Sequence, residues 1–250
     1  DFMKEIRNVL VIGLGAIGSI YATKFFDYDN ACVKVLLDKS RLERYIEDGI
    51  IFNNQRYDFE YVLEYDRFYK PDLIIIATKS SGLNDAVKSI KNFVKKDTII
   101  ISLINGITSE NEIAKIYGKD KVINSFYIGH SAMRENNSTK QDGIWKIVFG
   151  ANSYNKEKTE YLRQFLEQAN IDYEFSNDII YHQWVKFGVN ICLNQISAIY
   201  GINVGEVRKN HFELMEKLID EVVLVAQKVG LDTKSLKQDI INATYEIADD

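Results

Sequence analysis

The residues best suited to hold phosphate lie near the start of the chain, in the run Gly13-Leu14-Gly15-Ala16-Ile17-Gly18. This run has the G-x-G-x-x-G spacing of a dinucleotide-binding turn and directly follows the apolar segment 9–12. Gly13 permits a tight turn, Gly15 lets the backbone approach a pyrophosphate, and Gly18 lets the next helix pack closely on its strand. The N-terminus of that helix would offer unpaired N–H groups to the phosphates. A Gly-rich turn without a ligand is the alternative, and the apolar strand before the turn favours the cofactor site.

An acidic residue, Asp38, follows Gly18 at about the 20-residue spacing expected of the group that binds the adenosine ribose. Its carboxylate favours an unphosphorylated 2′-hydroxyl and repels a 2′-phosphate. Lys39 and Arg41 lie close enough to accept such a phosphate. The sequence therefore leaves both NADH and NADPH open as the cofactor.

A second group of reactive side chains recurs every four residues, at Lys186, Asn190 and Asn194. On an α-helix this spacing stacks the side chains along one face, each about 40° from the last. Apolar neighbours on both sides indicate a buried helix whose polar stripe needs partners. An ammonium can protonate a developing oxyanion, and amides can bind a carboxylate or hydroxyl without adding charge. The alternative is a structural stripe with its amides bonded to the backbone; after a nucleotide-binding domain we favour the catalytic face.

Short apolar strands must alternate with helices to position these groups. Besides 9–12, the sequence predicts strands at 33–37, 73–77 and 98–103, helices at 19–26, 40–45 and 82–94, and a hairpin at 50–63. This alternation indicates a Rossmann-like, doubly wound parallel sheet covered on both faces. Ligands bind such sheets beyond the carboxyl ends of the strands, which places Gly13, Asp38, Lys79 and Asn105 around one crevice.

The pattern changes beyond Lys121. Two strands and a helix come first, and then only helices, with the strands expected at 122–128 and 144–149 and the helices at 156–168, 178–200, 211–229 and 235–248. We therefore expect an α/β dinucleotide-binding domain over residues 1–175 and an all-helical substrate domain over residues 176–250. Two domains of this kind usually bind substrate in the cleft between them.

Composition argues against several other classes of protein. A formal net charge of -5 with mixed signs disfavours a general nucleic-acid binder. No uncharged apolar run is long enough for a membrane span and no leader precedes the first strand, so we expect a cytoplasmic protein. Cys32 and Cys192 lie in apolar stretches without metal-ligand spacing, so we expect reduced core thiols and no metal site.

Taken together, these segments resemble the ketopantoate reductases (2-dehydropantoate 2-reductases). The matching stretches are 13–19, 77–79, 105–107 and the spaced set Trp184, Lys186, Asn190 and Asn194, of which the last is the most specific. The resemblance implies reduction of a 2-keto acid with NAD(P)H, in pantothenate biosynthesis. It implies that Lys186 protonates the carbonyl oxygen, that Asn190 and Asn194 bind the substrate, and that Asn105 holds the nicotinamide end. Lys79 and Ala132 fall at cofactor-contact positions of the family.

The chain also departs from the family pattern. Asp38 stands where the family usually has an arginine, and the loop 130–143 lacks the usual glycines. A serine and an acidic residue of the family's active site have no counterpart before Asp250, so we expect them beyond it. Three functions follow: a ketopantoate reductase, which we favour; a dehydrogenase of another branched 2-keto acid; and a dinucleotide-binding sensor without catalysis. The expected partner is a small 2-keto acid, and we expect no binding to nucleic acid or membrane. The sequence leaves open whether the chain forms a homodimer.

Overall fold

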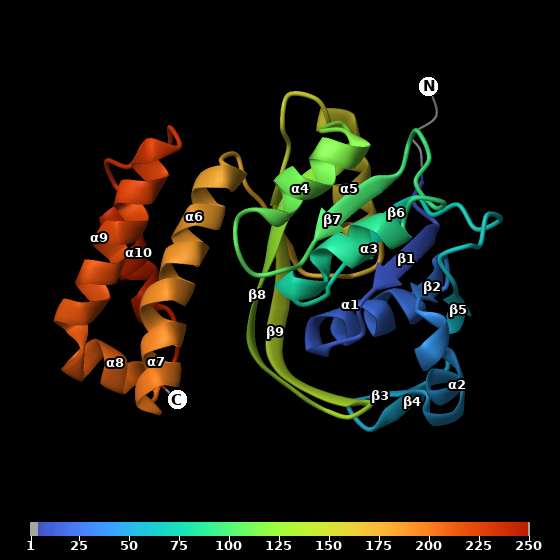
Figure 1. Cartoon of the computed structure of the whole chain (residues 1–250), viewed down its shortest axis with the longest axis horizontal. Helices are drawn as coiled ribbons and strands as arrows, with labels where there is room; N and C mark the ends of the chain where they lie inside the picture. The colour runs from blue at the N-terminus through green and yellow to red at the C-terminus, as the bar shows by residue number, and fades with distance from the viewer. Residues whose placement is uncertain (1–4, 250) are drawn as a thin grey trace. The chain divides into compact units, whose positions relative to one another are not determined.

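The computed structural model describes residues 5–249, apart from the side chains at positions 130 and 131. The chain divides by its internal contacts into two compact units, residues 1–179 and residues 180–250 (Figure 1). Residues 1–179 are unit 1 and residues 180–250 are unit 2.

Within the described residues, unit 1 contains a ten-stranded sheet. Its strands are β1 Asn8–Ile12, β2 Cys32–Leu36, β3 Ile50–Phe52, β4 Gln55–Tyr57, β5 Glu60–Val62, β6 Leu73–Ile76, β7 Ile99–Ser102, β8 Val122–Glu135, β9 Ser138–Gly150 and β10 Tyr173–Phe175. Their order is β4-β3-β9-β8-β7-β6-β1-β2-β5, and β10 also pairs with β9. The pairs from β8 through β7, β6, β1 and β2 to β5 are parallel, whereas β8 with β9 and β3 with β4 are antiparallel.

Helices cover both faces of this sheet, which confirms the predicted doubly wound architecture. They are α1 Ala16–Phe26, α2 Lys39–Asp48, the short η1 Ser80–Gly82, α3 Leu83–Ser89, α4 Ser109–Tyr117 and α5 Lys156–Gln168. One core cluster joins α1 and α5 to one face, where the rings of Phe25 and Phe165 stack with centroids 5.1 Å apart. A second cluster joins α3 and α4 to the other face. The sheet curls around α1, which contacts β1, β2, β3, β8 and β9 (Figure 1).

Unit 2 is helical throughout its described residues, as the sequence predicted. Its elements are α6 Ile179–Val189, the π-helical segment η2 Asn190–Asn194, α7 Gln195–Tyr200, α8 Val204–Asn210, α9 Phe212–Lys228 and α10 Leu236–Tyr245. Helix α9 buries Met215, Ile219, Val222 and Ala226 at helical spacing and contacts η2, α8 and α10. A capping box formed by Asn203 and Glu206 begins α8, a short helix that lies between two of the predicted helices.

Three local predictions were wrong. The loop expected at 130–143 is a hairpin, because β8 and β9 continue to a turn at Asn136 (φ 53°). Cys192 is buried, but Cys32 is exposed because it is the first residue of β2. The helix expected at 40–45 is longer, running from Lys39 to Asp48, and Asp38 occupies its N-cap position.

None of the helices in the described part of the chain has the length and hydropathy that a membrane crossing requires.

Candidate active site

The glycine turn joins β1 to α1, and two of its glycines are required by close contacts. Gly13 has a left-handed φ of 91°, and an added Cβ would lie 2.7 Å from the Ala77 carbonyl oxygen. A Cβ on Gly18 would lie only 1.7 Å from the Gly13 carbonyl oxygen. Any side chain at Gly18 would therefore push the start of α1 away from β1.

Gly15 differs from the other two glycines, because the fold itself does not require it. Its backbone is extended (φ -72°, ψ -164°), and an added Cβ would meet no heavy atom within 4 Å. It is also the N-cap of α1, a helix with no side-chain cap and no acidic residue in its first turn. The first-turn N–H groups are thus left for an outside acceptor, and the open space at Gly15 suits a pyrophosphate approaching the backbone.

The strand order brings four of the predicted site residues to one edge of the sheet. Strands β7, β6, β1 and β2 are parallel neighbours, and their carboxyl ends precede Asn105, Lys79, Gly13 and Asp38 respectively. Lys79 and Asn105 are exposed there. Ala132, a further residue predicted to contact the cofactor, is half-buried on β8 and packs against the core cluster that includes α1.

Asp38 is held as a charged acceptor. It accepts a hydrogen bond from the Ser40 hydroxyl, and its Oδ2 lies 3.0 Å from Arg41 Nε. The Ser40 hydrogen bond and then the Arg41 charge lower the pKa of Asp38 below its usual value. Its carboxylate therefore suits ribose hydroxyls at neutral pH.

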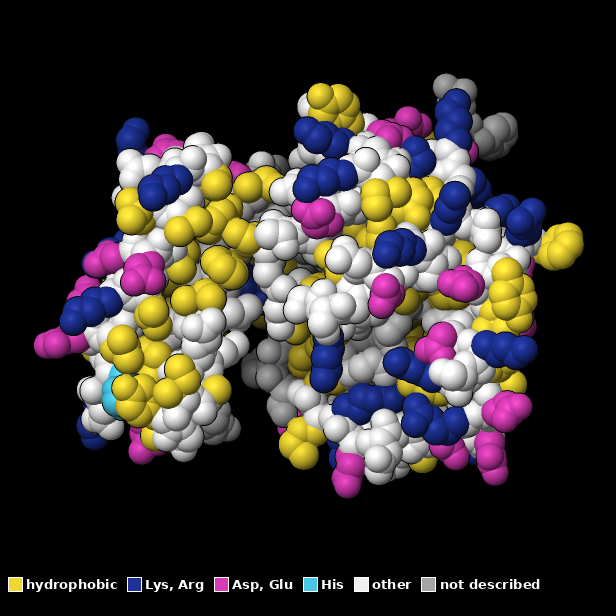
Figure 2. Space-filling view, in the orientation of Figure 1, with side chains coloured by type: hydrophobic (Ala, Val, Ile, Leu, Met, Phe, Trp, Pro, Cys, Tyr) yellow, Lys and Arg dark blue, Asp and Glu magenta, His cyan; other side chains and the backbone are white. Residues whose placement is uncertain are grey.

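Basic side chains nevertheless lie near Asp38. Lys and Arg side chains gather on the lower part of unit 1 in Figure 2, where Figure 1 places α1 and α2. Helix α2 contributes Lys39, Arg41 and Arg44, all exposed. This surface could also accept a 2′-phosphate, so the geometry leaves the choice between NADH and NADPH open.

Tyr127 is a site residue that sequence reasoning missed. The Asn105 side chain hydrogen-bonds its hydroxyl, and the Tyr127 ring stacks on Trp145 with centroids 5.5 Å apart and planes 23° apart. Asn105 is thus held by a side chain from β8, which fixes the amide expected at the nicotinamide end. A tyrosine within a predicted strand indicates core packing, so no signal in the sequence could have identified this contact.

The lysine and asparagines lie on consecutive segments in unit 2. Lys186 lies on α6, whereas Asn190 and Asn194 begin and end the π-helical segment η2. The predicted continuous α-helix over 178–200 is therefore interrupted, and single π turns of this kind occur frequently at functional sites. The two amides are still adjacent, since Asn194 Nδ2 donates to Asn190 Oδ1 at 3.2 Å.

Lys186 has the most strongly altered titration of the predicted site residues. It is half-buried, and burial lowers the pKa of its ammonium from the usual 10.5 to about 7. At that pKa the group can both hold and release a proton near neutral pH, as a general acid requires. Among the described residues, no group of three or more His, Cys, Asp or Glu side chains could hold a metal ion.

Unit 1 and unit 2 together define a Rossmann-type, dinucleotide-dependent oxidoreductase with a helical C-terminal region. The sequence model of the family "Ketopantoate reductase PanE/ApbA" matches residues 9–154. The model of the family's C-terminal part matches residues 178–250. The chain belongs to the ketopantoate reductase PanE/ApbA family, and it is an oxidoreductase.

Individual relatives agree with this assignment. The 2-dehydropantoate 2-reductase of Aquifex aeolicus is 28% identical over 233 residues, covering 90% of this chain and 74% of that protein. The Pyrococcus horikoshii enzyme of the same name is 32% identical over 174 residues, covering 68% of this chain and 55% of that protein. The fold is shared with a D-mandelate dehydrogenase, solved with NADH and anilino(oxo)acetate, which superposes with a TM-score of 0.80 at 23% identity, covering 97% of this chain and 81% of the other.

The glycine geometry separates a folding role from a binding role. Gly15→Val should leave the melting temperature unchanged and abolish cofactor binding, because the branched side chain would fill the open space beside the turn. Gly18→Ala should destabilise the fold by about 1–3 kcal/mol or more through overpacking. Thermal unfolding and calorimetric titration with NADH and NADPH measure both effects. Normal cofactor affinity in a folded Gly15→Val variant would contradict the binding role.

Proposed function

We propose that this protein reduces a 2-keto acid, 2-dehydropantoate, to the 2-hydroxy acid pantoate with NADH or NADPH. The observation that carries this proposal is the lowered pKa of Lys186, about 7. Lys186 lies on a helix that continues directly into the segment with Asn190 and Asn194. The family supplies the substrate class, and the relatives named 2-dehydropantoate 2-reductase support the particular substrate. Steady-state oxidation of NADH and NADPH against a panel of 2-keto acids, aromatic ones included, tests it.

The residues present in unit 1 fit a nicotinamide dinucleotide. The first-turn N–H groups of α1 and the space beside Gly15 suit the pyrophosphate, and Asp38 suits the ribose hydroxyls. Lys79 would add a positive charge at the same sheet edge, and Asn105, fixed by Tyr127, would hold the carboxamide. When bound, the reduced cofactor supplies a hydride to the keto carbon.

Hydride addition to a ketone leaves negative charge on its oxygen, so the reaction needs a donor at that oxygen. Lys186 would donate its ammonium proton there, and its lowered pKa reduces the cost of that transfer. The amides of Asn190 and Asn194 would bind the carboxylate and hydroxyl groups of the acid without a competing charge. Their mutual hydrogen bond orients both before the substrate arrives.

Removal of the lysine side chain should affect turnover rather than binding. Lys186→Ala is expected to lower kcat by roughly 10²-fold or more, the usual scale for a positioned general acid, with cofactor affinity near wild type. Lys217→Ala, on the exposed side of α9, is the matched control and should change neither quantity.

Asn190→Ala and Asn194→Ala should mainly raise KM for the keto acid. A structural stripe would instead lower the melting temperature and leave turnover intact, and full turnover in Lys186→Ala would end the catalytic assignment.

The pH dependence follows from the same group. Lys186 is charged below its pKa of about 7 and neutral above it. Reduction needs the charged form, so kcat/KM for reduction should be level below that pKa and fall about tenfold per pH unit above it. Oxidation of the hydroxy acid needs the neutral amine and should rise over the same range. Lys186→Arg, whose guanidinium stays charged over this pH range, should lack this descending limb, and a limb that persists in the variant would assign the titration to another group.

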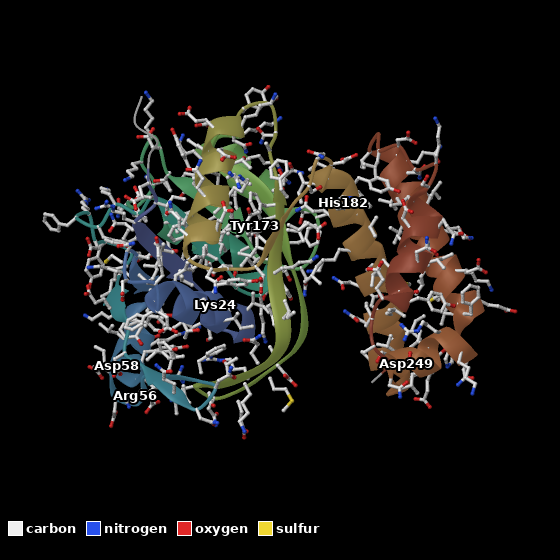
Figure 3. The ribbon with its side chains drawn as sticks, turned by 180° about the vertical axis from the view of Figure 1, so that it is seen from behind. Lys24, Arg56, Asp58, Tyr173, His182 and Asp249 are labelled. Atoms are coloured by element: carbon white, nitrogen blue, oxygen red, sulfur yellow. The ribbon has the colours of Figure 1, made fainter. Side chains whose placement is uncertain are left out.

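Cofactor preference depends on Asp38. We expect the wild type to use NADH at least as well as NADPH, and Asp38→Arg to shift the ratio of kcat/KM toward NADPH by providing a bidentate phosphate partner. The matched control is Asp58→Arg, since Asp58 is an exposed carboxylate that pairs with Arg56 on β4 at 2.9 Å (Figure 3). A wild type that strongly prefers NADPH, together with an unchanged ratio in Asp38→Arg, would show that Asp38 does not face the ribose.

A further inference from the structure

Arg134, on the hairpin strand β8, hydrogen-bonds the first turn of helix α1, which follows the glycine turn. Its Nη1 donates to Ser19 Oγ at 3.0 Å and to Thr139 Oγ1 at 3.3 Å, and both of these hydroxyl residues are fully buried. The Tyr45 side chain of α2 is a further hydrogen-bonding neighbour of the guanidinium. The arginine thus connects the hairpin to α1 and α2 within unit 1.

Ser19 connects Arg134 to the glycine turn by a second hydrogen bond. The Ser19 hydroxyl donates to the carbonyl oxygen of Leu14, between the first two glycines, at 3.4 Å. The Ser19 backbone N–H donates to the Gly15 carbonyl at 3.0 Å, which closes the first turn of α1. Arg134 is therefore one hydrogen-bonded side chain away from the backbone that would face the pyrophosphate.

The charge on Arg134 is unfavourable where it lies. Within the part of the chain that the structure describes, no carboxylate contacts the guanidinium, and Arg44 is its charged neighbour. Burial lowers the pKa of Arg134, which shows that its charged form is poorly solvated. A cation close to a helix N-terminus also opposes the helix dipole. An anion at the start of α1 would compensate the charge of Arg134.

We propose that Arg134 is a positioning residue for the dinucleotide's pyrophosphate: it braces the glycine turn through Ser19 and Leu14, and its charge is compensated when the diphosphate binds. This inference rests on the dinucleotide site of the proposed function. It concerns a side chain that acts on the turn through Ser19, not one that contacts the nicotinamide or the keto acid.

The test measures binding and stability rather than turnover. Arg134→Met should weaken the binding of NADH and of ADP-ribose to the same extent, by about tenfold, because both ligands carry the pyrophosphate. Adenosine, which has no phosphate, should bind as it does to the wild type. The melting temperature of the ligand-free protein should stay unchanged or rise, since an uncompensated charge is removed. Arg56→Met, which removes an exposed arginine paired with Asp58 (Figure 3), is the matched control and should leave every value unchanged.

The remaining outcomes are decisive. A lower melting temperature with unchanged affinity for ADP-ribose would make Arg134 a structural residue and overturn the proposal. If Arg134→Met does not fold, Ser19→Ala provides the test, because it keeps the charge and removes the link to Leu14; unchanged affinity in that variant also overturns the proposal. Failure of the wild type to bind NADH, NADPH or ADP-ribose would instead refute the dinucleotide site of the proposed function.

Discussion

The close approach of α1 to β1 is the constraint on which the rest of unit 1 depends. With no side chain at Gly18, the helix begins directly against the Gly13 carbonyl, and its next turns fill the space inside the curled sheet. Ile20, Tyr21 and Phe25 are completely buried there. The turn that would bind the cofactor is therefore anchored to one of the most tightly packed helices of the unit. Binding energy need not be used to order it, which is the usual meaning of a preorganised site.

Unit 2 shows the opposite requirement, because the role proposed for Lys186 needs a charged group that is only half-buried. A fully solvated lysine would hold its proton too firmly near neutral pH, and a fully buried one would lose it. Trp184 and Val189, on the same helix as Lys186, are buried, and burial lowers the pKa of the lysine. Two amides of the π segment that follows hydrogen-bond each other. The regular α-helical hydrogen bonding is therefore interrupted where the polar side chains of Asn190 and Asn194 lie.

Local sequence signals were sufficient for much of the architecture. The apolar runs predicted β1, β2, β6 and β7, and because parallel strands end at one edge, they also predicted which residues would gather there. The hairpin was missed because Met133 and Glu135 are exposed and the alternation with half-buried Ala132 and Arg134 contains few apolar residues. The π segment was missed because side-chain spacing does not show whether a backbone N–H bonds the carbonyl four or five residues before it. The contact between Arg134 and Ser19 spans 115 residues of sequence, so only the tertiary fold could show it.

The ends of the sheet have a consequence for how this protein behaves in concentrated solution. A ten-stranded open sheet could present long rows of unpaired backbone groups, which invite pairing with a second chain. Here the terminal strands β4 and β5 and the side strand β10 are each three residues long. The longest strands, β8 and β9, pair with each other along their length. Such short margins offer little template for strand addition, so the topology itself protects the chain against edge-to-edge aggregation.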